Sequence, residues 1–192
     1  MSEPEREAVN AFTSEAAMYH RMIRGEELPP MTNERFMELA CHARNIGAAA
    51  KAYRLRRPLT LYAGYSSGYS ALGYLWGNSP EQLEDLKLEY GGVFSSTTNR
   101  ATAIGFMEKS TFTRRVLLTI EASPGFFGLP AGELGLGHGI EEEVIVASQP
   151  LIVTSARRYP SGPNTVHETL ELYVRNGSVI EEQSESSLPA KS

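Results

Sequence analysis

The sequence contains very little of two residue types on which many functional sites depend. Its 192 residues include one cysteine, Cys41, and one aspartate, Asp85. A single cysteine excludes an internal disulfide and any zinc site built from several cysteines, which is typical of reducing compartments. The scarcity of aspartate disfavours Asp-based triads, EF-hand loops and Walker-B magnesium sites. Several common metal and nucleophile sites are therefore removed from consideration.

Long apolar runs and excess positive charge are also missing. The longest runs, such as VLLTI and EVIVA, are far shorter than the roughly 20 residues that a membrane helix needs, and the N-terminus MSEPEREAVN is too polar for a signal peptide. A formal net charge of −5 offers no general attraction for nucleic acid. We expect a cytoplasmic protein whose main partner is neither a membrane nor a nucleic acid.

Cys41 is followed directly by His42, which raises the possibility of a nucleophile and its base. Adjacent residues of a helix do not share a face, so the two side chains are poorly placed to react together. A lone buried cysteine usually behaves as a small hydrophobic residue. We interpret both as ordinary helix residues.

The N-terminal part carries two helical patterns. The first covers residues 3–24, and Gly25 with two later prolines ends it. The second begins at a capping sequence around Thr32 and continues toward Arg54 with apolar residues at helical spacing. Pro58 ends that pattern. The sequence predicts two helices before the first strand.

Beyond Pro58 the pattern changes to short apolar runs bounded by glycine, proline and serine. Two further stretches, residues 81–90 and 100–108, have helical character. The strand candidates are residues 59–64, 91–98, 114–122, 141–148, 150–159 and 169–176. Helices first and strands afterwards predict an α+β fold with an antiparallel or mixed sheet.

The length fits one domain, since domains commonly hold roughly 100 to 200 residues. We expect this domain to cover residues 1–177, with a helical part over 1–56 and a β-rich part over 57–177. Residues 178–192 are polar and rich in serine and glutamate, so we expect a disordered tail.

A glycine-rich segment, AGELGLGHGI, covers residues 131–140. A dinucleotide cradle would need a strand before it and a helix after it, whereas here a strand follows. We interpret the segment as a flexible loop whose conformation a partner sets, with an ordinary surface turn as the alternative.

Three glutamates, Glu141, Glu142 and Glu143, lead into the strand candidate that follows this loop. Side chains two residues apart on a strand share a face and lie roughly 7 Å apart along the chain. Glu141 and Glu143 would then converge, with Glu142 facing the other way. Such a pair could stabilise a cationic, sugar-like transition state and orient a basic acceptor. The alternative is a solvated acidic strand end.

Other polar side chains are less specific. The hydroxyl run from Ser95 to Thr98 is typical of a strand end that caps a helix, or of a site. Arg114 and Arg115 beside Phe112 could bind a phosphate, although surface arginine pairs are common.

The order of these segments is more informative than any one of them. LTLYAG is followed by FSSTTNRATAIGF and then by a glycine-rich loop running into EEEVIV. This order resembles the Arg-Ser-Glu class of mono-ADP-ribosyltransferases, which have L-Y-R-G, then F-x-S-T-S with A-x-x-F, then E-x-E before an apolar strand. The class occurs among bacterial toxins, phage enzymes and eukaryotic ectoenzymes. The match covers residues 59–148.

The resemblance implies the ADP-ribosyltransferase fold, in which N-terminal helices pack on two small sheets that form an NAD cleft. It also implies catalytic roles for three residues. Glu143 would stabilise the oxocarbenium-like state, Glu141 would orient the acceptor, and Ser96 would orient the catalytic glutamate. His138 and Gly139, in the loop before the pair, would contact the target protein. The implied NAD+ contacts are Ala63, Gly64, Ser96, Thr97, Thr98, Phe112 and Arg115.

The sequence departs from the family at Ala63, where L-Y-R-G has arginine. Losing one charge-assisted hydrogen bond costs roughly 1.5 to 3 kcal/mol, or about ten- to a hundredfold in binding. An inactivating substitution, a replacement by another arginine such as Arg57 or Arg115, and a domain that has lost the chemistry are three explanations.

The implied reaction transfers ADP-ribose from NAD+ to an arginine of a target protein and releases nicotinamide without a metal. Glutamate at the first position of the pair suits an arginine acceptor, because a guanidinium stays charged and favours a carboxylate partner. An NAD glycohydrolase and a catalytically silent binding module of the same fold are the alternatives.

Overall fold

The computed structural model describes residues 1–23, 27–66, 70–89, 92–108, 113–132, 134, 142–161 and 167–177. The expected tail, residues 178–192, lies outside them. The helices are α1 (Glu3–Ile23), α2 (Asn33–Ala52), α3 (Ser70–Gly73), α4 (Pro80–Leu83) and α5 (Arg100–Glu108), with a 3₁₀ turn at Tyr74–Gly77. The strands are β1 (Leu59–Ser66), β2 (Lys87–Glu89), β3 (Val93–Thr97), β4 (Arg114–Ala122), β5 (Gly128–Leu129), β6 (Glu143–Ala147), β7 (Pro150–Pro160) and β8 (Glu168–Asn176).

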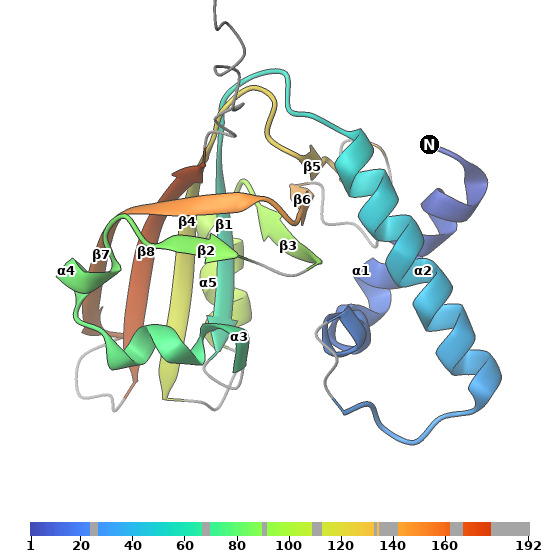
Figure 1. The fold of residues 1–192 in the computed structure, drawn as a ribbon, viewed down its shortest axis with the longest axis horizontal. Coiled ribbons are helices and arrows are strands. Elements are labelled where there is room, and N and C mark those ends of the chain that lie inside the picture. Colours follow the sequence, from blue (N-terminus) through green and yellow to red (C-terminus); the bar gives the residue numbers. More distant parts are fainter. Residues whose placement is uncertain are drawn as a thin grey trace, which may run out of the picture.

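The two N-terminal helices form where the sequence predicts them and pack against each other (Figure 1). Thr32 caps α2, because its side chain accepts a hydrogen bond from the backbone N–H of Arg35. The α1 helix is bent at Glu15, whose φ of −127° and ψ of 31° are not helical. The bend lets α1 follow the side of α2 while Phe12 and Tyr19 both remain fully buried.

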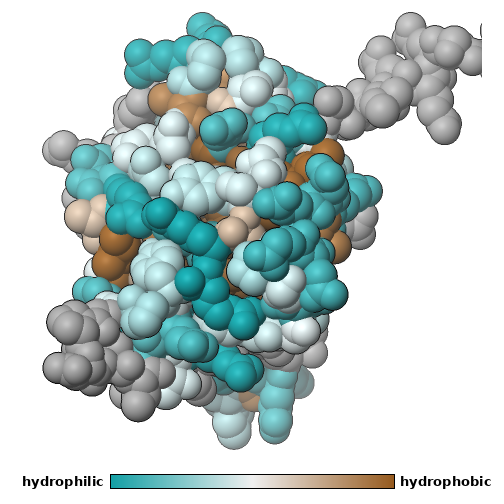
Figure 2. All heavy atoms as spheres, turned by 90° about the vertical axis from the view of Figure 1, so that its left-hand side faces the viewer, coloured by the Kyte–Doolittle hydropathy of each residue, from teal (hydrophilic) through white to brown (hydrophobic). Residues whose placement is uncertain are grey.

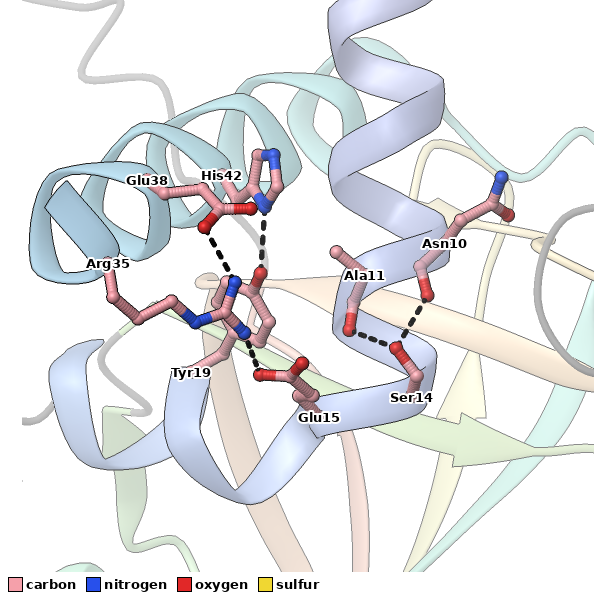
Figure 3. A network of polar contacts seen from close by, with 8 residues as sticks. All are labelled: Asn10, Ala11, Ser14, Glu15, Tyr19, Arg35, Glu38 and His42. Carbon is pink, nitrogen blue, oxygen red and sulfur yellow. Dashed lines mark hydrogen bonds and ion pairs between the residues drawn. The ribbon is translucent and has the colours of Figure 1, made fainter. Parts of the chain in front are cut away.

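A polar network holds the bend of α1 against α2 (Figure 3). Arg35 donates to Glu38 at 2.7 Å and also bonds Glu15 on α1. The hydroxyl of Tyr19 and Nδ1 of His42 are joined by a hydrogen bond of 2.8 Å. Burial, together with the nearby Glu15 charge, raises the pKa of Tyr19 to about 12, so the phenol stays protonated. His42 therefore has a structural partner on α1, in agreement with its interpretation as an ordinary helix residue.

The strands form one mixed sheet in the order β2-β7-β8-β4-β1-β3-β6-β5. Neighbouring strands are antiparallel except for β4 and β8, which are parallel. The expectation of two small sheets is therefore wrong. The physical reason is the pairing of β1 with β3 through one register position, Tyr62 opposite Thr97, which joins the two halves.

The sheet buries a large apolar cluster on each of its two faces. The α1 and α2 helices cover β3, β5 and β6, and residues such as Phe12, Ile46 and Ile145 fill the space between them (Figure 1). A larger cluster lies on the other face, where Leu61, Phe94 and residues of β4, β7 and β8 meet. The α5 helix packs on β1 and β4 through Ala103 and Met107, a smaller cluster of its own.

Two local predictions differ from the structure. Residues 81–90 have helical character in the sequence, but the helix stops at Leu83 and Lys87–Glu89 form β2. Asp85 adopts a φ of 61°, which a helix does not allow, and Lys87 then pairs with Ile152 of β7. The short strand β5 was not predicted, because two residues carry no periodic signal.

No described helix is long and apolar enough to cross a membrane.

Candidate active site

Glu143 is the first residue of β6 and lies opposite Thr97 of β3. Only 7% of its surface is exposed. The hydroxyl of Ser95 donates a hydrogen bond of 2.8 Å to Oε1 of its carboxylate. Burial raises the pKa of Glu143 above its ordinary value, and the hydrogen bond from Ser95 offsets part of that rise. A carboxylate held this way is weakly solvated, so a positive charge placed beside it is strongly stabilised.

Ser95, rather than Ser96, donates the hydrogen bond that orients the Glu143 carboxylate. Side chains alternate between the two faces of a strand, and the register pairs Ser96 with Val144. Ser95 therefore shares a face with Glu143, whereas Ser96 points to the opposite face and donates to the carbonyl of Val144 at 2.7 Å. The hydroxyl that bonds Glu143 is therefore that of Ser95 and not, as the resemblance implied, that of Ser96. Ser96 instead ties β3 to β6.

Thr97 is the last residue of β3, and Thr98 follows it in the turn into α5. The Thr97 hydroxyl accepts a hydrogen bond from the backbone N–H of Asn99 at 3.1 Å. The backbone N–H of Thr98 donates to the carbonyl of Glu142 at 3.2 Å. These bonds fix the turn beside Glu143. Of the two threonines, Thr98 lines the cavity described next.

A cavity of about 1350 Å³ opens beside Glu143. It lies between the connection from α2 to β1, the turn before β5 and the start of β6. This volume is above the roughly 300–1000 Å³ of usual small-molecule sites, so it has room for a dinucleotide. Its lining consists of Ala52, Tyr53, Arg54, Leu55, Arg56, Arg57, Leu59, Thr98, Gly125, Gly128, Pro130, Glu142, Glu143 and Val144.

Three arginines of the α2–β1 connection line this cavity together with Glu143. Arg54 has a structural role, because its guanidinium stacks on the Phe127 ring at 4.0 Å and donates to the carbonyl of Gly125. Arg56 and Arg57 are exposed at the cavity wall. Arg57 was a candidate from the sequence, and Arg56 was not. The signal was the basic run RLRR just before the first strand.

Two residues of the predicted NAD+ contact set lie away from this cavity, on β1. Ala63 is 2% exposed and belongs to the large apolar cluster, with Leu118 opposite it on β4. Gly64 faces α5, where an added Cβ would come within 2.1 Å of the Ala103 carbonyl oxygen. Its lack of a side chain serves helix packing.

Arg115 is also absent from the lining of the Glu143 cavity. It is buried on β4 and pairs with Ser66 near the end of β1. Four further predicted residues, Phe112, His138, Gly139 and Glu141, lie outside the residues that the structure describes. Within the described ranges, no group of three or more His, Cys, Asp or Glu side chains could hold a metal ion.

Comparison with protein-family models and with characterised protein sequences finds no match for this chain. Solved structures do match. The chain is similar to Plx2a, an ADP-ribosyltransferase toxin from Paenibacillus larvae, with a TM-score of 0.65 and 13% identity over 93% of this chain and 88% of that one. An ADP-ribosyltransferase from Clostridium botulinum gives a TM-score of 0.63 and 12% identity, over 91% of this chain and 88% of that one.

A third similar structure, a protein from S. aureus that was solved with NAD, gives a TM-score of 0.60 and 11% identity over 92% of this chain and 89% of that one. These similarities extend over nearly the whole chain. At 11–13% identity they establish the fold alone. The chain has the α+β ADP-ribosyltransferase fold, with N-terminal helices and a mixed eight-stranded sheet.

Proposed function

We propose that this chain is a mono-ADP-ribosyltransferase that moves ADP-ribose from NAD+ to an arginine of a target protein and releases nicotinamide. The observation that carries the proposal is the buried Glu143, oriented by Ser95, beside a dinucleotide-sized cavity in a chain with this fold. The reaction breaks the bond between the nicotinamide nitrogen and the ribose C1′. A new bond then forms from C1′ to a guanidinium nitrogen, which loses a proton.

Glu143 supplies the charge that this reaction needs. The ribose becomes cationic as nicotinamide leaves, and an ionised carboxylate with little water around it stabilises that cation. Burial raises the pKa of Glu143, so this carboxylate ionises, and becomes active, at a higher pH than an ordinary glutamate does. We assign Glu141 the role of binding the acceptor guanidinium, on the strength of its spacing from Glu143.

Arg56 and Arg57 are the proposed partners of the NAD+ pyrophosphate. Guanidinium groups match phosphate oxygens in a bidentate way, and both side chains line the cavity that contains Glu143. The family resemblance places an arginine at Ala63, but that position is enclosed in the apolar cluster. Arginines on the α2–β1 connection, which do line the cavity, would neutralise the phosphates in its place.

The experiment is transfer of label from NAD+ carrying a radioactive adenylate phosphate. The purified chain is incubated with a bacterial lysate and, separately, with agmatine, a small guanidinium acceptor. We expect labelled protein bands and ADP-ribosyl-agmatine from the wild type. Glu143→Gln should lower both by at least about a hundredfold, comparable to the loss of one preorganised charge at a transition state. Glu121→Gln, an exposed glutamate of β4, is the matched control.

Two other outcomes would identify the competing functions. Nicotinamide release that depends on Glu143 but leaves agmatine and protein unlabelled would indicate an NAD glycohydrolase, with water as the acceptor. Absence of NAD+ consumption and of NAD+ binding would indicate a silent binding module. The apolar surroundings of Ala63 are the observation that favours the silent module.

A further inference from the structure

Residues 53–57, the arginine segment, follow α2 and carry the three arginines that line the cavity beside Glu143. The segment belongs to neither a helix nor a strand. It is held by a turn that comes much later in the chain. The backbone N–H of Leu55 donates to the carbonyl of Phe126 at 2.9 Å, and that of Gly125 donates to the carbonyl of Leu55 at 2.8 Å. The position of the three arginines therefore depends on this turn.

The ring of Phe127, in the same turn, holds Arg54 directly. The guanidinium carbon of Arg54 lies 4.0 Å from the centroid of the ring, and its Nη1 donates to the carbonyl of Gly125 at 3.3 Å. Stacking uses the face of a guanidinium, so it leaves in-plane N–H groups available to a ligand. Arg54 lines the cavity, whereas Phe127 does not. Phe127 can therefore act on the cavity only through Arg54.

The side chain of Gln149 fixes the backbone of Phe127. Its Oε1 accepts a hydrogen bond from the Phe127 N–H at 3.0 Å, and its Nε2 donates to the Phe127 carbonyl at 2.8 Å. The same Nε2 donates to the carbonyl of Ala147, the last residue of β6, at 3.3 Å. Gln149 also lies outside the cavity lining. One side chain thus joins the turn that carries Phe127 to the end of β6.

The turn is attached to β6 at several further points. The chain after Phe127 runs antiparallel to β6, where β5 pairs with Ile145 and Val146. At the start of β6, the backbone N–H of Gly132 donates to the carbonyl of Glu143 at 3.2 Å. Both strands lie beside the C-terminal end of α2 (Figure 1). The strand that begins at Glu143 therefore also sets the position of the arginine segment.

A stacked arginine does not by itself mark a ligand site. Arg158 of β7 also stacks on an aromatic ring, 4.8 Å from the centroid of Trp76. The side of the molecule that carries α4 and β7 is mostly hydrophilic (Figure 2), and four strands separate β7 from β6 in the sheet. Neither Arg158 nor Trp76 lines the cavity beside Glu143. The Arg54 stack differs because its guanidinium forms part of that cavity.

We propose that Phe127 and Gln149 are positioning residues of the NAD+ site, which hold the arginine segment at the cavity wall before the dinucleotide binds. This inference rests on the proposed function. A long side chain that must be ordered by its ligand weakens binding, because it loses rotamer freedom. Arg54 is ordered in advance by the Phe127 ring. Removing the ring should weaken NAD+ binding by about three- to tenfold, the range expected for ordering one such side chain.

The test is calorimetric titration of the full chain with NAD+, together with kcat and KM for NAD+ with agmatine as the acceptor. Phe127→Leu keeps an apolar side chain and removes the ring. We expect its Kd and KM to rise by about three- to tenfold, with kcat and the acidic limb of the pH profile unchanged, because the bond from Ser95 to Glu143 is untouched. Phe127→Tyr keeps the ring and should bind as the wild type does. Phe36→Leu, at an exposed phenylalanine of α2, is the matched control.

Gln149→Met tests the same link from its other end, and it serves also if Phe127→Leu does not fold. It keeps the length of the side chain and removes the hydrogen bonds to Phe127 and Ala147. We expect a weaker Kd for NAD+, again at unchanged kcat.

Wild-type affinity in both Phe127→Leu and Gln149→Met would overturn this inference and leave the proposed function intact. Equally weak binding by Phe127→Tyr and Phe127→Leu would also overturn it, because the ring would then not be the cause. A fall in kcat at unchanged Kd would mean that these residues act on Glu143 and not on NAD+ binding, against the proposal. Absence of NAD+ binding by the wild type would overturn the proposed function and this inference together, so the two failures can be told apart.

Discussion

At the scale of single residues, the buried charge of Glu143 opposes folding, and we propose that it is retained for catalysis. Its pKa is raised in the folded chain, so its contribution to stability is favourable below the unfolded pKa and is lost as the pH rises through the folded pKa. Glu143→Gln stays neutral at every pH. We therefore expect the variant to melt at a higher temperature than the wild type at pH 7, and this gain to disappear below about pH 4.3.

Thermal unfolding followed by circular dichroism between pH 3 and 8 measures this difference. Glu121→Gln, which removes an exposed carboxylate from β4, should show no such pH-dependent gain. A lower melting temperature for Glu143→Gln at pH 7 would mean that the carboxylate stabilises the fold, contrary to its burial. Taken with the expected loss of activity, a gain in stability would identify Glu143 as a residue retained for function.

The two adjacent serines give a second prediction. The Ser95 hydroxyl stabilises the ionised form of Glu143, so Ser95→Ala should raise the pKa of that carboxylate further. The acidic limb of the pH–activity profile should move to higher pH. The activity near neutral pH should fall about tenfold, the effect of losing one hydrogen bond to a charged group. Ser96→Ala removes a bond to the carbonyl of Val144 and should leave the limb in place. The reverse result would show that the register of β3 and β6 differs from the one described.

Ala63 carries a third prediction. Because this position is enclosed by apolar side chains, Ala63→Arg introduces an unpaired charge into the core. We expect it to destabilise the chain by about 3–5 kcal/mol and not to increase NAD+ binding. Thr60→Arg places the same side chain at an exposed position of the same strand and is the control. Urea denaturation measures the difference, and a stable Ala63→Arg variant with stronger NAD+ binding would contradict it.

The sequence predicts Glu143 as a candidate because its spacing matches a motif, whereas Ser95 and Arg56 could not be assigned in this way. Choosing between Ser95 and Ser96 needs the pairing register, since a shift of one residue exchanges the faces of a strand. Arg56 precedes Leu59, the first residue of β1, and reaches the site only because the Leu55 backbone bonds the turn at Gly125 and Phe126. That pairing spans about 70 residues and leaves no local signal.

At the scale of secondary-structure elements, the packing of α5 on β1 depends on Gly64. A Cβ there would lie 2.1 Å from the Ala103 carbonyl oxygen and 3.1 Å from the Met107 Cβ. Gly64→Ala should therefore displace α5 and destabilise the fold by about 1–3 kcal/mol, as overpacking does. Gly47→Ala, at a helix position with open space, should instead stabilise by about 0.5–1 kcal/mol. Chemical denaturation of both variants tests the contrast, and equal behaviour would exclude the close approach.

Helices and strands with a long periodic pattern were predicted correctly from the sequence. Short segments that form strands only by pairing with a neighbouring strand were not. The α1 and α2 helices have 21 and 20 residues and the central strands β1 and β4 have 8 and 9, long enough for a periodic pattern to be recognised. Lys87–Glu89 form β2 because they pair with the edge of β7. Leu129, in β5, pairs with Ile145 of β6 in the same way. Neither segment has enough residues to specify a strand alone.

At the scale of the whole molecule, the sheet has a narrow junction. One register position, Tyr62 with Thr97, joins the part that carries β4, β7 and β8 to the part covered by α1 and α2. Sequence patterns predict the strands on either side but not this connection, nor the parallel pairing of β4 with β8, because both are contacts between distant segments. The two-sheet expectation failed at this junction.

The cavity beside Glu143 spans the two parts of the molecule, which leads to the last prediction. Its wall combines the α2–β1 connection with the start of β6, so a ligand bound there stabilises both parts against separation. NAD+ at a hundred times its Kd should add about 2.7 kcal/mol to the free energy of unfolding, seen as a rising melting temperature. Arg56→Gln should reduce this increment at equal NAD+ concentration, while the exposed Arg175→Gln should not. Equal increments in both variants would exclude Arg56 from the binding site. An increment that vanished in the wild type would instead indicate that this cavity does not bind NAD+ at all.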